Sequence, residues 1–297
     1  MALDMTLAIG SFDGIHTGHA AVIRVALLSD RNAGVVCFEP VPRQYFGKGS
    51  WSRRLTTSFE RTKILRELGI DKILLYPFDK TTVNMEPEAF LEDLYARQQF
   101  TRLVVGYDFH FGRNRKGTER FLKQWCTSRR IDAIIVPPLK VGDMPVKSER
   151  IRNLLENGDV RQAELLLGRQ YSVTGAVSRG KGVGRKLGFP TVNVRVPFCK
   201  LLPEPGSYAG IVTLDESDRR MPAAVFVPGN ATGPVEAHMI NRIENLYGCG
   251  MTVSFCSRLR GIVSSGSMGE LSGLIAEDIR NVKKLAEEEK WMEDPEK

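Results

Sequence analysis

The stretch "TLAIGSFDGIHTGH", residues 6–19, decides the fold of the first half of the chain. It begins with an apolar run, turns at Gly10 and Gly14, and leads into a helical pattern over residues 19–30. A strand that passes through glycines into a helix is typical of a parallel sheet, in which ligands bind at the carboxyl ends of the strands. The stretch therefore predicts a ligand site at this turn.

Two of the four histidines of the chain, His16 and His19, lie three residues apart in this turn. At that spacing both rings can donate hydrogen bonds to one phosphate group and offset charge that develops on a leaving pyrophosphate. Glycine backbone N–H groups and the positive end of the next helix favour the same ligand. The residues alone leave open a simpler role, in which both histidines only cap the turn and the helix. The stretch contains neither a Walker A loop nor G-x-G-x-x-G.

Strand-like and helical patterns alternate over the first 140 residues. The strand-like runs are 6–12, 34–40, 72–78, 102–109 and 132–139, and the helical patterns are 19–30, 57–68, 86–98 and 117–130. Most of the strand-like runs are almost continuously apolar, as in strands that are covered on both faces. This alternation predicts an α/β, doubly wound, Rossmann-like domain with a parallel sheet.

The pattern changes after residue 168. Two short helices are expected over 148–168, and short strand-like runs follow at 171–180, 190–196, 207–214, 221–227, 235–240 and 251–256. Such runs, separated by glycine, proline and charged turns, predict an antiparallel sheet or a small antiparallel β-barrel. A final amphipathic helix should start at Ser267, with Glu270 as the capping-box partner, and the charged tail after it should fray. We expect domains at residues 1–168 and 169–297.

Composition limits the function classes. The net charge of +7, from 42 basic and 35 acidic residues, suits polyphosphate ligands. The chain lacks the basic blocks with interleaved aromatic residues that are typical of nucleic-acid binding, so we expect no nucleic-acid partner. The sequence contains no apolar run of about 18 residues, so we expect no membrane span. The first residues do not resemble a signal peptide. Five scattered cysteines fit reduced thiols in the cytoplasm. The sequence leaves the oligomeric state open.

The chain resembles a known enzyme family. "GSFDGIHTGH" resembles the G-x-F-D-G-x-H-x-G-H signature of nucleotidylyltransferases, and is most similar to that of bacterial bifunctional riboflavin kinase/FAD synthetases. The resemblance continues through "FEPVPRQYF" from Phe38, "VVGYDFHFGRNRKG" from Val104, "ERIRNLLENGDVRQAELLLGRQY" from Glu149, "GRKLGFPTVN" from Gly184 and "VEAHMINRIENLYG" from Val235. It covers essentially the whole chain in the order of the family.

The resemblance implies that the N-terminal domain transfers AMP from ATP to FMN, giving FAD and pyrophosphate. His16 and His19 would be catalytic and hold the ATP phosphates. The other expected ATP-binding residues are Gly10, Ser11, Phe12, Asp13, Gly18, Ser148 and Arg152. Asp108, Phe109 and Phe111 would line the flavin side. From the residues alone, an exposed loop with solvated charges is the favoured interpretation of the 104–117 segment, because charge runs usually form solvated faces.

The resemblance also implies that the barrel phosphorylates riboflavin with ATP. Glu236 would take the proton from the ribityl hydroxyl of the flavin. Thr191 and Asn193 would ligate Mg²⁺, because oxygen ligands suit this hard ion. The expected phosphate segment contains Lys181, Gly182, Gly184, Arg185, Lys186 and Gly188, together with Thr191 and Asn193. His238 is expected to pack on a strand face.

Three stretches depart from the family pattern. "KSERIR", residues 147–152, stands for S-S-T-x-I-R, "VPGNATG" for G-x-R-P-T-F, and "LRGIVSSGSM" for R-x-E-x-x-F. The sequence therefore predicts a cytoplasmic enzyme that makes FMN and then FAD from riboflavin with ATP and Mg²⁺. The alternatives are an FMN adenylyltransferase with a degenerate barrel and a flavin-binding protein without turnover.

Overall fold

The structure is a computed structural model that describes residues 5–29, 32–47, 52–180, 182–215, 217–230, 233–240, 246–264 and 267–291. Contacts group the chain into two compact units, Met1–Ser148 and Glu149–Lys297. In this division, residues 149–168 group with the second unit. The domain boundary expected at residues 168 and 169 stays a prediction. No helix of the described residues has the length and apolar character needed to cross a bilayer.

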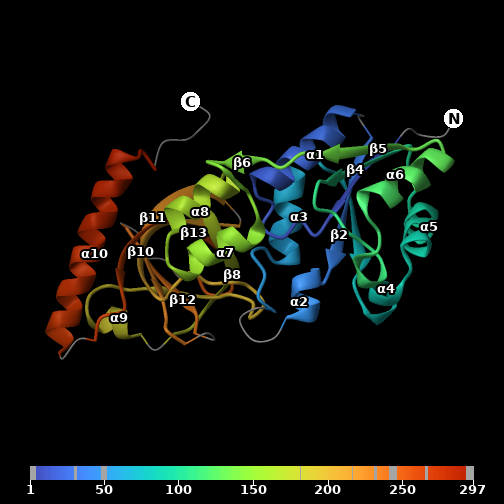
Figure 1. Ribbon diagram of the computed structural model, residues 1–297. Helices are drawn as coiled ribbons and strands as arrows, with labels where there is room; N and C mark the ends of the chain where they lie inside the picture. The colour runs from blue at the N-terminus through green and yellow to red at the C-terminus, as the bar shows by residue number, and fades with distance from the viewer. Residues whose placement is uncertain are drawn as a thin grey trace. The chain divides into compact units, whose positions relative to one another are not determined.

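The first unit contains a five-stranded parallel sheet in the order β3-β2-β1-β4-β5 (Figure 1). Its strands are β1 (Thr6–Gly10), β2 (Ala33–Glu39), β3 (Lys72–Pro77), β4 (Arg102–Gly106) and β5 (Asp132–Val136). β1 lies at the centre, where Ala8 pairs with Val35 of β2 on one side and with Val104 of β4 on the other. The strand order reverses at this point, and the predicted doubly wound sheet is confirmed.

Helices lie along this sheet. They are α1 (Thr17–Ser29), α2 (Pro42–Phe46), α3 (Ser58–Glu67), α4 (Lys80–Asn84), α5 (Pro87–Arg97) and α6 (Glu119–Ser128), with a 3-10 turn, η2, at Arg113–Arg115. Four were predicted, and α1 starts two residues earlier than expected, so that His19 lies in its first turn. The capping box at Thr57 and Glu60 is confirmed, since each side chain accepts the backbone N–H of the other residue. The short helices α2 and α4 were not predicted.

Two apolar cores cover the faces of the sheet. On one face Ile9, Phe38 and Val105 pack with Phe90 of α5 and Trp125 of α6. On the other face, alternate residues of the same strands pack with α1 and α3, among them Ala8, Val35, Cys37, Val104, Ile23 and Leu65. Burial on both faces explains the continuous apolar runs in the sequence. It also leaves only the strand ends open to ligands.

The second unit is a closed antiparallel barrel in the order β10-β11-β12-β9-β8-β13. Its strands are β8 (Tyr171–Ser178), β9 (Val192–Arg195), β10 (Gly206–Leu214), β11 (Ser217–Val227), β12 (Val235–Met239) and β13 (Gly250–Gly261), with the short helix α9 (Val183–Lys186) between β8 and β9. The predicted barrel is confirmed. Closure pairs every strand on both sides and leaves no free sheet edge.

The predicted helix pair at 148–168 is present as α7 (Ser148–Glu156) and α8 (Val160–Leu167). Asp159 caps α8 by accepting the N–H of Gln162, and Gly168 ends it in the left-handed conformation with φ 73°. α8 packs on β13, and the N–H of Glu204 donates to the carbonyl of Leu155 at 2.8 Å. A two-stranded hairpin, β6 (Lys140–Val141) and β7 (Met144–Pro145), precedes the pair.

The last helix, α10 (Met268–Glu288), packs on β10 and β11 and is capped by Ser267 as predicted. Its expected apolar stripe contains one acid, Asp278, which is only 5% exposed. Arg260 pairs with Asp278 at 2.7 Å, and the hydroxyl of Ser207 donates to the same carboxylate at 2.8 Å. The expectation that the whole tail frays is wrong for Trp291, which is 4% exposed because it packs in this core.

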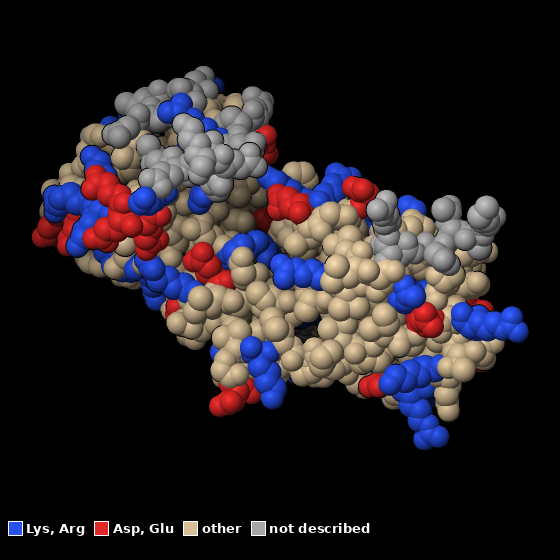
Figure 2. Space-filling view, turned by 90° about the horizontal axis from the view of Figure 1, so that it is seen from above, with Lys and Arg blue, Asp and Glu red and all other residues tan. Residues whose placement is uncertain are grey.

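All five cysteines are free thiols. Burial raises the pKa of Cys37 to about 11 and that of Cys126 and Cys256 to about 12. These three are therefore protonated and unreactive at neutral pH. On the face shown in Figure 2, basic and acidic side chains are interspersed.

Replacing Asp278 should destabilise the barrel unit. Asp278→Ala leaves the buried part of Arg260 without its counter-charge, and we expect a loss of about 1–3 kcal/mol in the free energy of unfolding. Urea unfolding followed by tryptophan fluorescence measures it. Glu277→Ala, at the exposed neighbouring position, is the control and should change stability by less than about 0.5 kcal/mol. Equal stability of both variants would contradict a structural role for the Asp278 contacts.

Candidate active sites

The turn between β1 and α1 adopts a compact, strained backbone. Phe12, Gly14 and Ile15 have φ values of 46°, 87° and 38°, in the left-handed region. Gly14 has a second reason to be glycine, since a Cβ there would lie 2.7 Å from a methyl carbon of Leu55. Phe12 and Ile15 are 1% and 2% exposed, so their side chains anchor the turn in the core. The turn is therefore firmly held at the point where the strand order reverses, which is where sheets of this kind bind ligands.

His16 and His19 stack against each other at the start of α1. Their ring centroids are 3.7 Å apart and their planes differ by 14°. The backbone N–H of His19 donates to Nδ1 of His16 at 3.2 Å, so His16 carries its ring proton on Nε2. A Cβ on Gly18 would lie 3.2 Å from the His16 ring, which explains the glycine of the H-x-G-H spacing. The structure brings together the two histidines that the sequence singled out.

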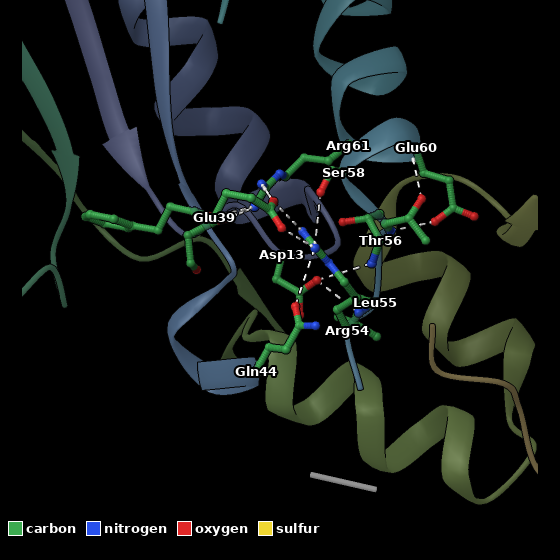
Figure 3. Close-up of polar contacts among 12 residues, drawn as sticks. Asp13, Glu39, Gln44, Arg54, Leu55, Thr56, Ser58, Glu60 and Arg61 are labelled. Carbon is green, nitrogen blue, oxygen red and sulfur yellow. Dashed lines mark hydrogen bonds and ion pairs between the residues drawn. The ribbon is translucent and has the colours of Figure 1, made fainter. Parts of the chain in front are cut away.

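Asp13 connects this turn to the segment before α3 (Figure 3). Its carboxylate accepts the backbone N–H groups of Leu55 and Thr56 at 2.9 and 3.1 Å. The hydroxyl of Thr56 accepts the N–H of Gly14 at 3.0 Å, and the hydroxyl of Ser148 donates to the Asp13 carbonyl at 2.8 Å. Asp13 is 4% exposed, so these contacts support the turn from inside the protein.

A charge network with two buried arginines, which no local sequence pattern indicates, lies beside the turn. Glu39, at the end of β2, pairs with Arg54 at 2.8 Å and with Arg61 of α3 at 2.5 Å. Arg54 is 2% exposed, and its guanidinium also donates to the Ser58 hydroxyl at 3.2 Å. Burial alone would raise the pKa of Glu39, but hydrogen bonds from Arg54 and Ser58 and the charges of both arginines lower it. Figure 3 shows both guanidinium groups pointing at this carboxylate.

The segment after β4 is only partly the exposed loop that the residues alone suggested. Asp108 is exposed and lies 3.9 Å from Nζ of Lys147. Phe109 stacks on Phe111 at 5.4 Å, and Phe111 is 5% exposed because it packs against Phe90. His110, the third histidine, is exposed, and its Nδ1 contacts the carbonyl of Asp108 at 3.0 Å. Asp108 and Phe109 are thus the more accessible of the three expected flavin residues.

Exposed aromatic rings lie near the carboxyl ends of β2 and β3. Tyr45 and Phe46 of α2 are 40% and 63% exposed, and each packs edge-on against Phe78, at 5.5 and 5.8 Å. Exposed rings at the ligand end of a sheet offer flat apolar faces to a planar ligand. The sequence pattern of this segment indicates no role for these rings, because their exposure depends on α2.

The start of α7 contains the "KSERIR" departure. Glu149 is exposed in the first turn of the helix, where an acidic side chain interacts favourably with the helix dipole. Arg152 is 2% exposed. Contact of Ser148 and Arg152 with ATP phosphates stays a prediction.

The barrel gathers the residues expected for the second site. Glu236 of β12 pairs across the sheet with Asn193 of β9, and the hydroxyl of Thr191 donates to Oε2 of Glu236 at 3.2 Å. A Cβ on Gly180 would lie 2.3 Å from the Asn193 amide, and a Cβ on Gly184 would lie 3.4 Å from the Thr191 hydroxyl. The chain after β8 therefore passes directly over these polar groups. One carboxylate, one hydroxyl and one amide converge at this position.

The glycine-rich chain around α9 has left-handed turns at Gly182 and Gly188, with φ values of 69° and 83°. Arg185 is exposed, whereas Lys181 and the side chain of Lys186 lie outside the described residues. Nδ1 of His238 contacts the carbonyl of Pro190 at 2.9 Å, and its ring packs edge-on against Phe189. These contacts give His238 a packing role beside the site.

Comparison with known families divides the chain in the same way. The family model described as FAD synthetase matches residues 2–150, and the model described as riboflavin kinase matches residues 167–286.

Individual relatives match almost the whole chain. The bifunctional riboflavin kinase/FMN adenylyltransferase of Escherichia coli (strain K12) is 29% identical over 282 residues, which cover 92% of this chain and 90% of that protein. The protein of the same name from Bacillus subtilis (strain 168) is 27% identical, with 92% and 89% covered. Among solved structures, a macrolide-efflux protein from Streptococcus pneumoniae matches with a TM-score of 0.83 and 25% identity over 95% of both chains.

The charge network predicts how acid affects the first unit. Because the pKa of folded Glu39 lies below the ordinary value of 4.5, its contribution to stability is present above about pH 4.5 and is lost as the pH falls through the lower, folded pKa. Glu39→Gln should lower the free energy of unfolding near neutral pH by about 1–2 kcal/mol and flatten its decline on acidification. Urea unfolding at a series of pH values tests this. Glu67→Gln, at an exposed position of α3, is the control, and a parallel decline in the parent and Glu39→Gln would contradict the prediction.

Proposed function

Since this chain belongs to the FAD synthetase family and continues into a riboflavin kinase domain, we propose how its residues divide the work of a bifunctional enzyme. It phosphorylates riboflavin to FMN with ATP, and it adenylylates FMN to FAD with release of pyrophosphate. Matches to both family models favour this activity over a degenerate barrel or a binding protein without turnover. A cytoplasmic location remains part of the proposal, and the scattered free cysteines support it.

Adenylyl transfer takes place at the turn between β1 and α1. A phosphate oxygen of FMN attacks the α-phosphorus of ATP, and the bond from that phosphorus to the bridging oxygen of pyrophosphate breaks. The stacked His16 and His19 are the observation that carries this assignment. At the positive end of α1, Nε2–H of His16 and the ring of His19 stabilise the charge that develops on the leaving pyrophosphate. Gly10, Ser11, Phe12 and Gly18 shape the phosphate platform around them.

The flavin of FMN binds beside this turn. Asp108 and Phe109 are accessible after β4, while the burial of Phe111 supports a role in holding Phe109 in place. The exposed rings of Tyr45 and Phe46 offer a second apolar face for the isoalloxazine ring. We place Ser148 and Arg152 on the ATP side.

Riboflavin phosphorylation takes place at Glu236 in the barrel. Its carboxylate takes the proton of the ribityl hydroxyl, whose oxygen attacks the γ-phosphorus of ATP as ADP leaves. The hydroxyl proton of Thr191 orients Glu236, and Asn193 lies opposite on β9. Gly182 and Gly184 let the backbone approach the phosphates, next to Lys186.

Mg²⁺ fits this second site. Thr191 donates its proton to Glu236, so its oxygen lone pairs remain available to a cation, and the carbonyl oxygen of the Asn193 amide is a second hard ligand. When bound, the ion would neutralise charge on the transferred phosphoryl group.

His19→Ala should strongly lower the rate of FAD formation and leave the rate of riboflavin phosphorylation unchanged. The loss of one donor to developing charge costs roughly 10²–10³ in rate. The rates of FAD formation from FMN and of FMN formation from riboflavin, each with ATP and Mg²⁺, measure this effect. Equal loss of both activities would contradict the assignment of separate sites.

Asn193→Ala and Glu236→Gln should reduce riboflavin phosphorylation and spare adenylyl transfer to FMN. Removing a general base typically costs about 10²–10⁴ in rate, and each variant should retain FAD formation from supplied FMN. Chromatographic separation of riboflavin, FMN and FAD distinguishes the two steps. A variant that makes FMN at the parent rate would show that the changed residue is not part of the kinase site.

A further inference from the structure

Arg61 is a buried cation that reaches the backbone of the adenylyl-transfer turn. It is 0% exposed, and its Nη1 donates to the carbonyl of Ser11 at 2.9 Å and to that of Phe38 at 3.2 Å. Its Nη2 pairs with Glu39. A guanidinium is costly to bury unless charge and hydrogen bonds satisfy it. These contacts tie α3 and the end of β2 to the turn.

The contact with Ser11 fixes a peptide group of the phosphate platform. In a trans peptide the carbonyl and the next N–H point in opposite directions. When Arg61 holds the Ser11 carbonyl, the N–H of Phe12 is therefore directed away from Arg61. Phe12 has a φ of 46°, which a non-glycine residue keeps only when its surroundings determine it strongly. Arg61 supplies part of that constraint.

Arg54 shows what an arginine in this network does without the turn contact. It is as buried as Arg61 and pairs with the same carboxylate of Glu39. Its guanidinium also donates to the side chains of Gln44 and Ser58 rather than to the turn backbone. The two arginines therefore form a natural pair for comparison, because both stabilise the network and only Arg61 is seen to hold a carbonyl of residues 10–19.

We propose that Arg61 is a positioning residue for adenylyl transfer, acting through the Ser11–Phe12 peptide to aim the Phe12 N–H at the ATP phosphates. The proposal rests on the assignment of adenylyl transfer to this turn. Arg61 itself touches no substrate, because it is fully buried behind the turn. Its effect is to hold a donor in the geometry that the transition state needs.

The test compares Arg61→Met with Arg54→Met in the full-length enzyme. Each variant loses one buried guanidinium and keeps the other beside Glu39. A misplacement of about 1 Å in a catalytic group can cost on the order of 10² in rate, so kcat for FAD formation should fall by about that factor in Arg61→Met. It should fall several-fold at most in Arg54→Met. Arg61→Lys, which keeps a donor and the charge, should restore part of the rate.

Two further readouts separate positioning from stability. Riboflavin phosphorylation in the barrel is the internal control and should be unchanged in all three variants. Thermal unfolding should show similar losses for Arg61→Met and Arg54→Met, with rates measured well below both transitions. If Arg61→Met does not fold, Arg61→Lys and Arg54→Lys are compared in its place, and kcat should fall further in Arg61→Lys.

Equal kcat values in the paired variants, or a parent-like kcat in Arg61→Met or in Arg61→Lys, would overturn the proposal while leaving the assigned function intact. A parent enzyme that makes FMN and no FAD would overturn the assigned function, and the proposal with it.

Discussion

The structure of the first unit depends on how a strained turn is held at the point where the strand order reverses. Positive φ values at Phe12 and Ile15 are unfavourable for side-chain-bearing residues, so the turn needs support from elsewhere. That support comes from about forty residues away, as the Asp13 carboxylate accepts two N–H groups of residues 55 and 56 and Arg61 donates to Ser11. The stacking of His16 and His19 follows from the turn, because Gly18 leaves room for the His16 ring.

This arrangement separates the two histidines that we propose as substrate contacts from the groups that hold the turn. The two histidines begin α1, where backbone N–H groups and the helix dipole already favour anions. Arg54 and Arg61 are buried beside the turn and pair with the part-exposed Glu39, and the low exposure of the arginines strengthens their hydrogen bonds. Burying the two arginines costs desolvation, which their ion pairs and hydrogen bonds offset.

In the barrel, the register between neighbouring strands brings the expected site residues together. Pairing of β12 with β9 sets Glu236 opposite Asn193, and Thr191 precedes β9 by one residue, which lets its hydroxyl reach the carboxylate. The glycines at 180 and 184 then allow the chain after β8 to pass within van der Waals distance of these groups. The position of Glu236 therefore depends on the strand register, since a slip of one residue would turn its side chain to the other face of the strand.

The sequence by itself determined the alternation of strands and helices, the change to antiparallel strands after residue 168, and the glycine-rich turn that carries His16 and His19, because these depend on local periodicity and spacing. The family resemblance added the barrel residues, which have no local signature. Only the tertiary structure decided the roles of Glu39, Arg54 and Arg61, since each is an ordinary charged residue until folding buries the two arginines against the carboxylate. The same holds for Asp278 within an apolar stripe and for the exposed rings of Tyr45 and Phe46. Local pattern sets which elements form, whereas burial and pairing between distant segments set what a charge or a ring does.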